Sequence, residues 1–218
     1  MLKSLGELLR KLTDYILPPR TDFEIVKKLD EVAIQSLPKS PEVVGLDWVH
    51  PLFHYKDRRV KAIIWELKYK NNTLQLTTIG KMLFDEILAV VSDISTFNSD
   101  AQFVLIPIPI TNAKRSERGY NQSEYVCRSI IENDPEHILL YAPQWFSKVK
   151  DTPSQSHSET KEERMKNLSD SFEANPQVEN KYVILIDDVV TTGSTLLEAR
   201  KELLSKGAHD VLAFTIAH

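Results

Sequence analysis

The stretch that decides the fold is YVILIDDVVTTGSTLLEA, which covers residues 182–199. Its first five residues, 182–186, form an apolar run that is typical of a buried strand. Asp187 and Asp188 follow this run directly, and a polar turn then leads into helical spacing over residues 195–205. A strand, a polar turn and a helix in this order predict one unit of a parallel sheet.

Two further apolar runs extend the same pattern. Residues 103–106 run into Pro107-Ile-Pro109 and are followed by a helical pattern over 122–131. Residues 211–217 predict a last strand, after a glycine, Gly207, that suits the end of the preceding helix. Apolar strands that alternate with helices predict an α/β fold, with a mostly parallel central sheet that is flanked by helices on both faces.

The first hundred residues predict helices. Helical patterns cover residues 23–34, the 60–67 region and residues 74–91, and a leucine stripe between residues 2 and 12 is expected to pack on the core. A soft boundary near residue 50 divides the chain into a small, mostly helical N-terminal region, 1–50, and a larger domain, 51–218.

Composition excludes several classes of protein. The 218 residues contain 27 Lys and Arg against 31 Asp and Glu, a net charge of −4, which excludes a uniformly basic nucleic-acid binder but not a local basic patch. A single cysteine, Cys127, excludes an intrachain disulfide and a cysteine-based zinc site. No apolar run approaches the roughly 18 residues of a membrane-spanning helix, and the start is no signal peptide. We expect a cytoplasmic protein.

The polar part of the deciding stretch predicts a site for a sugar phosphate. Ligands of open parallel sheets lie beyond the carboxyl ends of the strands, where Asp187 and Asp188 stand. A tight turn followed by a helix N-terminus offers unpaired N–H groups to a phosphate, while the two acids can accept hydrogen bonds from ribose hydroxyls. The residues expected at the phosphate are Thr191, Thr192, Gly193, Ser194 and Thr195.

Three other interpretations compete with this one. The stretch could be an ordinary capped helix with solvated acids at its start. An acidic strand end also occurs in nucleotide triphosphatases, but the chain has no GxxxxGK[ST] loop. A phospho-receiver domain would place more strands after its acidic pair than the single strand that remains here.

The whole stretch resembles the phosphoribosyl-pyrophosphate signature of the type I phosphoribosyltransferases: an apolar strand, two acids, two variable positions and Thr-Thr-Gly-x-Thr. VLIPIPITNAKRSERGYNQ at 104–122 and TPSQSHSETKEERMKNLSDSF at 152–172 are similar to segments of the ComF (ComFC-like) family, as is the stretch from Tyr55 to Tyr69. The resemblance runs from about residue 50 to the last residue. It implies the type I phosphoribosyltransferase fold.

One departure concerns metal. ComF proteins commonly begin with a cysteine-rich zinc module, whereas residues 1–50 contain no cysteine. The N-terminal region is therefore expected to be a degenerate, zinc-less counterpart of that module, with no zinc ligands.

The resemblance implies a reaction and a cofactor. The substrate would be phosphoribosyl pyrophosphate with Mg²⁺, and an acceptor nitrogen of unknown identity would displace pyrophosphate. Asp187 and Asp188 would be the catalytic pair that holds the ribose hydroxyls, directly or through magnesium. The Thr191–Thr195 turn would hold the 5′-phosphate. Some members carry an acid directly before Thr-Gly, but this chain has Thr191 there, so no dedicated general base is expected.

The pyrophosphate would lie at the end of the other strand, over residues 110–118. The expected contacts are Thr111, Asn112, Lys114, Arg115 and Arg118, and the alternative is an exposed basic loop that pairs locally with Glu117. Asn121 and Gln122 are expected to cap the next helix rather than to touch substrate.

A long loop over residues 147–167 is expected to close over the reacting groups, as in the superfamily. Its candidate contacts are Lys148, Lys150, Gln155 and Arg164. His157 lies in the same loop and is expected to be solvated rather than an acid or base.

Residues 56–70 combine six basic side chains with neighbouring aromatic ones, among them Trp65 and Tyr69. They could contact single-stranded DNA by stacking and charge, or form a charged helix face whose aromatic rings turn into the core. The leading hypothesis is a transferase. The rival is a non-catalytic phosphoribosyl-pyrophosphate-binding accessory protein of DNA uptake that contacts single-stranded DNA or competence proteins. Whether the protein forms a homodimer stays an open question at this point.

Overall fold

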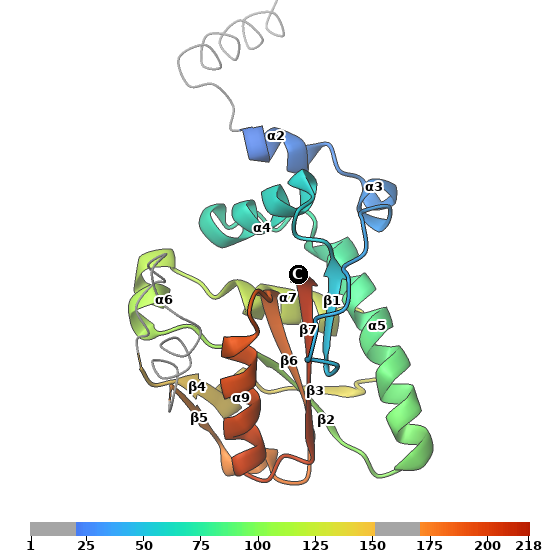
Figure 1. The fold of residues 1–218 in the computed structure, drawn as a ribbon, viewed down its shortest axis with the longest axis vertical. Coiled ribbons are helices and arrows are strands. Elements are labelled where there is room, and N and C mark those ends of the chain that lie inside the picture. Colours follow the sequence, from blue (N-terminus) through green and yellow to red (C-terminus); the bar gives the residue numbers. More distant parts are fainter. Residues whose placement is uncertain (1–20, 151–170) are drawn as a thin grey trace, which may run out of the picture.

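The structure, a computed structural model, describes residues 21–150 and 171–218. Its central sheet has the strand order β1-β7-β6-β2-β3, and all four pairs of neighbours are parallel (Figure 1). The α/β fold and the parallel sheet predicted from the sequence are confirmed. The strands are β1 Val49–Phe53, β2 Phe103–Pro107, β3 Leu139–Tyr141, β6 Tyr182–Val189 and β7 Asp210–Ala217.

A separate antiparallel hairpin lies outside this sheet. Its strands are β4 Phe146–Lys148 and β5 Phe172–Ala174, with the short 3-10 helices η1 Pro143–Trp145 and η2 Pro176–Val178 beside them. The stacked rings of Phe146 and Phe172, whose centroids are 5.0 Å apart, hold the two strands together. The sequence patterns did not predict this hairpin.

The order of the strands creates a switch point between β6 and β2. From β2 the chain passes through α7, Gln122–Ile131, to the outer strand β3, whereas from β6 it passes through α9, Ser194–Ser205, to β7 on the other side. Because both crossovers are expected to be right-handed, they place α7 and α9 on opposite faces. The segments after β2 and β6 therefore diverge, and ligands of such sheets bind between them.

The remaining helices cover one face and the carboxyl edge. The long helix α5, Leu76–Phe97, packs against α7, while α4, Arg58–Lys70, lies beyond the carboxyl edge of the sheet, toward which β7 points (Figure 1). Asp57 caps α4 by accepting a hydrogen bond from the Arg59 amide. The short helices are α2 Thr21–Lys27, α3 Glu31–Gln35 and α6 Asn112–Arg118.

The helix predicted over residues 23–34 is wrong as one element. The chain forms α2 and α3 instead, because the Asp30 side chain accepts a hydrogen bond from the Ala33 amide, 2.8 Å away, and so starts a second helix. The leucine stripe of residues 2–12 lies outside the described residues.

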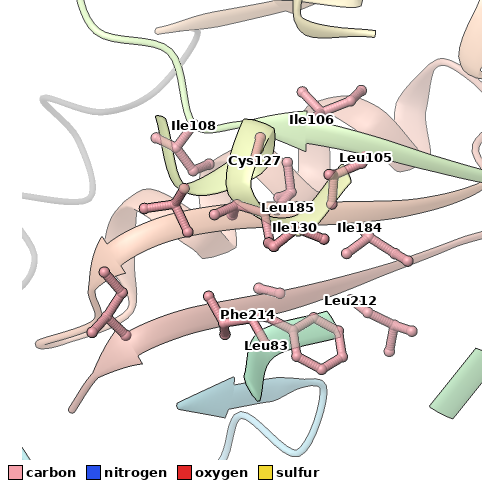
Figure 2. Close-up of a cluster of buried hydrophobic side chains, with 14 of the residues drawn as sticks. Leu83, Leu105, Ile106, Ile108, Cys127, Ile130, Ile184, Leu185, Leu212 and Phe214 are labelled. Atoms are coloured by element: carbon pink, nitrogen blue, oxygen red, sulfur yellow. The ribbon is translucent and has the colours of Figure 1, made fainter. Parts of the chain in front are cut away.

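The core lies between the sheet and the α5–α7 layer. Figure 2 shows side chains of β2, β6 and β7, such as Leu105, Leu185 and Phe214, together with Ile130 of α7 and Leu83 of α5. All five are almost fully buried. The buried strands therefore place the carboxyl end of β6 on a rigid support.

Strand β1 crosses the boundary that was predicted near residue 50. It pairs with β7 from Val49 to Phe53, so residues on both sides of position 50 belong to one strand. Leu46 and Trp48, which precede it, are buried in the same cluster as the sheet. The division into two domains stays a prediction, and its expected position falls inside a strand.

Candidate functional site

The two acids stand at the carboxyl end of β6, inside the strand rather than after it. Asp187 Oδ1 accepts hydrogen bonds from the Asp188 amide, at 2.9 Å, and from Ser123 Oγ, at 3.3 Å. Asp188 Oδ1 accepts one from the Val189 amide at 2.9 Å, and its Oδ2 lies 2.8 Å from Lys68 Nζ. Two helices thus contribute to the acid pair: α7 supplies the Ser123 hydroxyl and α4 supplies the Lys68 ammonium group.

The ionisation of this group is set by burial and by mutual charge. Burial raises the pKa of Asp187 above its ordinary value, the neighbouring Asp188 charge raises it further, and Lys68 opposes both effects. Burial alone would lower the pKa of Lys68, but the two carboxylates outweigh it and the net shift is upward. Lys68 therefore stays charged and compensates the acid pair.

A tight turn after β6 forms the expected phosphate cradle. Gly193 has φ of 73°, in the left-handed region that favours glycine, and a Cβ at this position would collide with Leu46 Cδ1. Thr192 Oγ1 and Ser194 Oγ are 2.8 Å apart. Gly193 is the N-cap of α9 and has no side chain to bond the first amides of the helix, so these donors face the turn. Thr191 is exposed and Thr195 is half-buried.

The segment after β2 carries the cations that were expected at pyrophosphate. Thr111 caps α6 by accepting a hydrogen bond from the Lys114 amide at 3.3 Å. Arg115 pairs with Glu124 of α7 rather than with Glu117, the partner considered in the alternative. Arg118 donates a hydrogen bond to Gln122 Oε1 at 3.3 Å, and its guanidinium lies 5.4 Å from the centroid of the Tyr69 ring.

A cavity of about 480 Å³ joins this segment to the hairpin. Asn112 and Arg115 line one side of it and Lys148 lines another, so three residues predicted in two separate motifs meet around one space. The Lys148 ammonium lies 5.3 Å from the centroid of the Phe172 ring. Lys150 is exposed, next to the cavity-lining Val149. Gln155, Arg164 and His157 lie outside the described residues.

Residues 120–122 connect the cations to α7 and α4. Asn121 caps α7 by accepting from the Ser123 amide at 3.1 Å, and its Nδ2 donates to Ile108 O at 3.0 Å, so the capping role predicted for Asn121 is confirmed. For Gln122 the same prediction is wrong, because Gln122 is the first residue of α7 and its Oε1 accepts from Arg118 instead. The Tyr120 hydroxyl donates to Leu67 O and accepts from the Asn71 amide, both at 2.9 Å. Tyr120 therefore fastens the last turn of α4 to the basic segment.

The aromatic rings of α4 lie on the surface. Trp65 is 39% exposed and Tyr69 is 55% exposed, and their ring centroids are 5.6 Å apart. The alternative in which these rings turn into the core is therefore wrong. Apolar residues such as Ile63, Ile64 and Leu67 fill the buried side of α4 instead.

Lys68 is the site residue that sequence reasoning missed. Lys68 is one of the six basic side chains of residues 56–70, and nothing in the sequence pattern shows that this helix reaches the end of β6. In the described ranges no group of three or more His, Cys, Asp and Glu is placed to hold a metal ion. Across those same ranges, no helix has the length and apolarity needed to cross a membrane.

Comparisons with known proteins agree with this geometry. Residues 146–217 match the family described as "Phosphoribosyl transferase domain". The chain is 32% identical over 157 residues to "Competence protein ComFC" of Bacillus subtilis. The matched region covers 68% of this chain and 61% of the relative. It is 26% identical over 154 residues to "DNA utilization protein YhgH" of Salmonella typhimurium, and this match covers 70% of this chain and 64% of that relative. The chain thus spans less than two thirds of either relative.

Among solved structures, the glutamine phosphoribosylpyrophosphate amidotransferase from B. subtilis, complexed with ADP and GMP, is similar with a TM-score of 0.43 and 16% identity. The match covers 70% of this chain and 30% of that one.

Proposed function

Because the chain is a ComF-like member of the type I phosphoribosyltransferase superfamily, we propose that it binds Mg-phosphoribosyl pyrophosphate and transfers the phosphoribosyl group to a nitrogen acceptor. The superfamily fold expected from the sequence is confirmed. The observation that carries the proposal is the placement of two adjacent carboxylates beside an open glycine turn at the switch point of the sheet.

The proposed reaction needs two groups of residues: one that holds the ribose and its 5′-phosphate, and one that holds the leaving pyrophosphate. The acceptor nitrogen forms a bond to the anomeric carbon with its lone pair, the bond from that carbon to pyrophosphate breaks, and pyrophosphate leaves with the electron pair. Asp187 and Asp188 would hold the ribose hydroxyls, and the Thr191–Thr195 turn would hold the 5′-phosphate. Lys114, Arg115 and Arg118 would stabilise the charge that develops on the leaving group. The acceptor's proton goes to water or to the leaving group, since we assign no general base.

The acid pair suits magnesium. Mg²⁺ is usually held by one or two carboxylates together with substrate phosphates and water, not by an all-protein cage. Asp187 and Asp188 would supply such oxygen ligands, and Oδ2 of the half-buried Asp187 accepts no hydrogen bond from the residues that the structure describes. When bound, the metal would neutralise phosphate charge.

Ligand binding is tested by melting and by calorimetry. Saturating Mg-phosphoribosyl pyrophosphate, at 100 times its dissociation constant, should stabilise the protein by about 2.7 kcal/mol and raise the melting temperature by several degrees. Asp188→Asn should abolish this shift. The same variant should melt lower without ligand, because Lys68 loses its partner, at a cost of about 1–3 kcal/mol. No shift of the wild-type protein would refute the proposal.

Catalysis is tested by pyrophosphate release across a panel of bases and amines. Release with one acceptor supports the transferase. Tight binding without release for any acceptor supports the non-catalytic accessory protein instead.

The exposed rings of α4 favour a second candidate function, contact with single-stranded DNA. We call the α4 face the surface formed by side chains of α4 and its neighbours: Tyr55, Lys61, Trp65, Tyr69 and Arg118. The Lys61 ammonium lies 5.8 Å from the centroid of the Tyr55 ring, and the Arg118 guanidinium lies over the Tyr69 ring. Stacking rings and cations together suit unpaired bases. Fluorescence anisotropy with an oligo-dT should show salt-dependent binding that Trp65→Leu and Tyr69→Leu weaken. If both variants bind the oligo-dT as tightly as the wild type does, the α4 face is excluded as the binding site for single-stranded DNA.

A further inference from the structure

We propose that Lys68 is a displaceable counter-ion that closes the ligand-free site: its ammonium occupies Asp188 until metal and ribose hydroxyls take its place. This inference rests on the proposed function for the identity of the ligand. It assigns a role to a residue that the signature of the acid pair does not include.

The contact itself leaves no room for a ligand on Asp188. Asp188 Oδ1 is already bonded to the Val189 amide, and Oδ2 is 2.8 Å from Lys68 Nζ. The Asp188 side chain is 4% exposed and the Lys68 side chain 25%, so the ammonium forms the cover over the carboxylate. A hydroxyl or a metal ion can reach Oδ2 only after this ammonium has moved.

Lys68 can move because its stem is flexible and its side chain is 25% exposed. The helix ends at Lys70, and its C-cap Asn71 adopts a left-handed conformation with φ of 52°. Upstream residues of α4, such as Val60 and Ile63, are buried and fix the rest of the helix. Leu67 is buried as well, and Tyr120 bonds the backbone on either side of Lys68, so the flexible stem of Lys68 is the part that is free to move.

The same final turn also contacts the basic segment. Tyr120 bonds Leu67 O and the Asn71 amide on either side of Lys68, and Arg118 lies over Tyr69. Acid pair and cations, the two ends of the proposed ligand site, thus meet at one helical turn. A ligand that binds both ends would contact Arg118 and displace the Lys68 ammonium, while Tyr120 holds the helix backbone between them.

The first test observes the ammonium directly. Lysine side-chain ¹H–¹⁵N NMR of the full chain should resolve a slowly exchanging signal from Lys68, which is identified by its loss in Lys68→Arg. Saturation with Mg-phosphoribosyl pyrophosphate should shift or remove that signal. A Lys68 signal that stays unchanged in the bound protein would overturn the inference.

The second test measures the affinity for a metal ion in the absence of phosphoribosyl pyrophosphate. Lys68→Met removes the competing charge, so Mn²⁺, followed by electron paramagnetic resonance, should bind about tenfold more tightly than to the wild type. Lys81→Met, which removes an exposed lysine of α5, is the matched control and should leave Mn²⁺ affinity unchanged. Equal Mn²⁺ affinity in Lys68→Met and wild type would contradict the inference.

The two proposals can fail separately. If the wild type shows no melting shift with Mg-phosphoribosyl pyrophosphate but Lys68→Met tightens Mn²⁺ binding, the proposed ligand is wrong and the counter-ion role stands. If the melting shift occurs but Mn²⁺ affinity and the NMR signal do not respond, the counter-ion role is wrong. The NMR test uses only the wild type and the conservative variant Lys68→Arg, so it decides the question even if Lys68→Met is unstable.

Discussion

Gly193 carries two separate constraints at the phosphate turn: a left-handed backbone with φ of 73°, and the Leu46 side chain where a Cβ would lie. Gly45 has a similar φ of 78° but open space around its missing Cβ. We expect Gly45→Ala to cost about 1–2 kcal/mol, from backbone strain alone. Gly193→Ala should cost more and also lose the ligand-induced melting shift. Urea unfolding and melting with Mg-phosphoribosyl pyrophosphate measure both effects.

The contrast between the two glycines is the control. Equal losses of stability with ligand binding retained in Gly193→Ala would show that the turn does not approach a phosphate closely.

We expect His50 on β1 to make the stability of the protein depend on pH. Its ring stacks on Phe214 with a centroid distance of 4.8 Å, and burial lowers the pKa of His50 although Glu86 and Asp47 act to raise it. Since the unfolded chain binds the proton more tightly, the contribution is complete above the ordinary histidine pKa of about 6.5 and is lost as the pH falls below it. His50→Phe keeps an aromatic ring but cannot titrate.

Urea unfolding between pH 5 and 8 checks this expectation. The wild type should lose stability relative to His50→Phe as the pH falls through the histidine range. A difference between the two proteins that is independent of pH would show that His50 is equally protonated in the folded and unfolded states.

Residue patterns predicted the acid pair and the glycine turn but not Lys68. The acids, the turn and the helix are consecutive in sequence, so their local order already implies a common place at the end of β6. Lys68 reaches Asp188 from more than a hundred positions away. Only the packing of α4 over the sheet edge brings them together, and the basic residues around Lys68 predicted a solvated face instead.

At the level of elements, α5 and α7 approach each other at Gly80. A Cβ on this residue would lie 2.7 Å from Ser129 Cβ and 2.8 Å from the Ser129 carbonyl carbon. Ala in place of Gly normally stabilises a helix by about 1 kcal/mol. Here we expect Gly80→Ala to destabilise the protein by about 1–3 kcal/mol, because two backbones must separate. Chemical denaturation measures whether the substitution lowers or raises the free energy of unfolding.

The position of α7 also matters for the site, since Ser123 in its first turn donates to Asp187. Gly80→Ala should therefore also weaken ligand binding. A gain in stability would mean that the two helices are free to move apart.

Elements were predictable where the sequence is long and regular. β2, β6, β7, α4, α7 and α9 were expected within three residues of their bounds, whereas α5 was expected to end at residue 91 and continues to Phe97. β1 was missed because its sequence VHPLF contains Pro51, which argues against a central strand but is tolerated at an edge, where β1 lies. β3, β4 and β5 have three residues each, too few for a pattern.

At the scale of the whole molecule, β1 joins the N-terminal part of the chain to the sheet. It pairs in parallel with β7, and the Ala213 amide bonds Trp48 O at 2.9 Å. Residues before position 50, among them Ile34 and Leu46, are buried in the core that the sheet forms. The sequence boundary near residue 50 followed a change in pattern, which does not show where the buried surfaces meet.

Truncation tests whether the chain divides at that point. A chain of residues 51–218 loses part of β1 and exposes the edge of β7, so we expect it to aggregate or to unfold without a cooperative transition. Residues 46–218 keep all of β1 and Trp48, and should retain more protected β7 amides in hydrogen exchange than residues 51–218. The full chain should unfold cooperatively. A cooperative transition of residues 51–218 near that of the full chain would establish residues 51–218 as a separate domain, and the N-terminal part would then be an attachment rather than a component of the core.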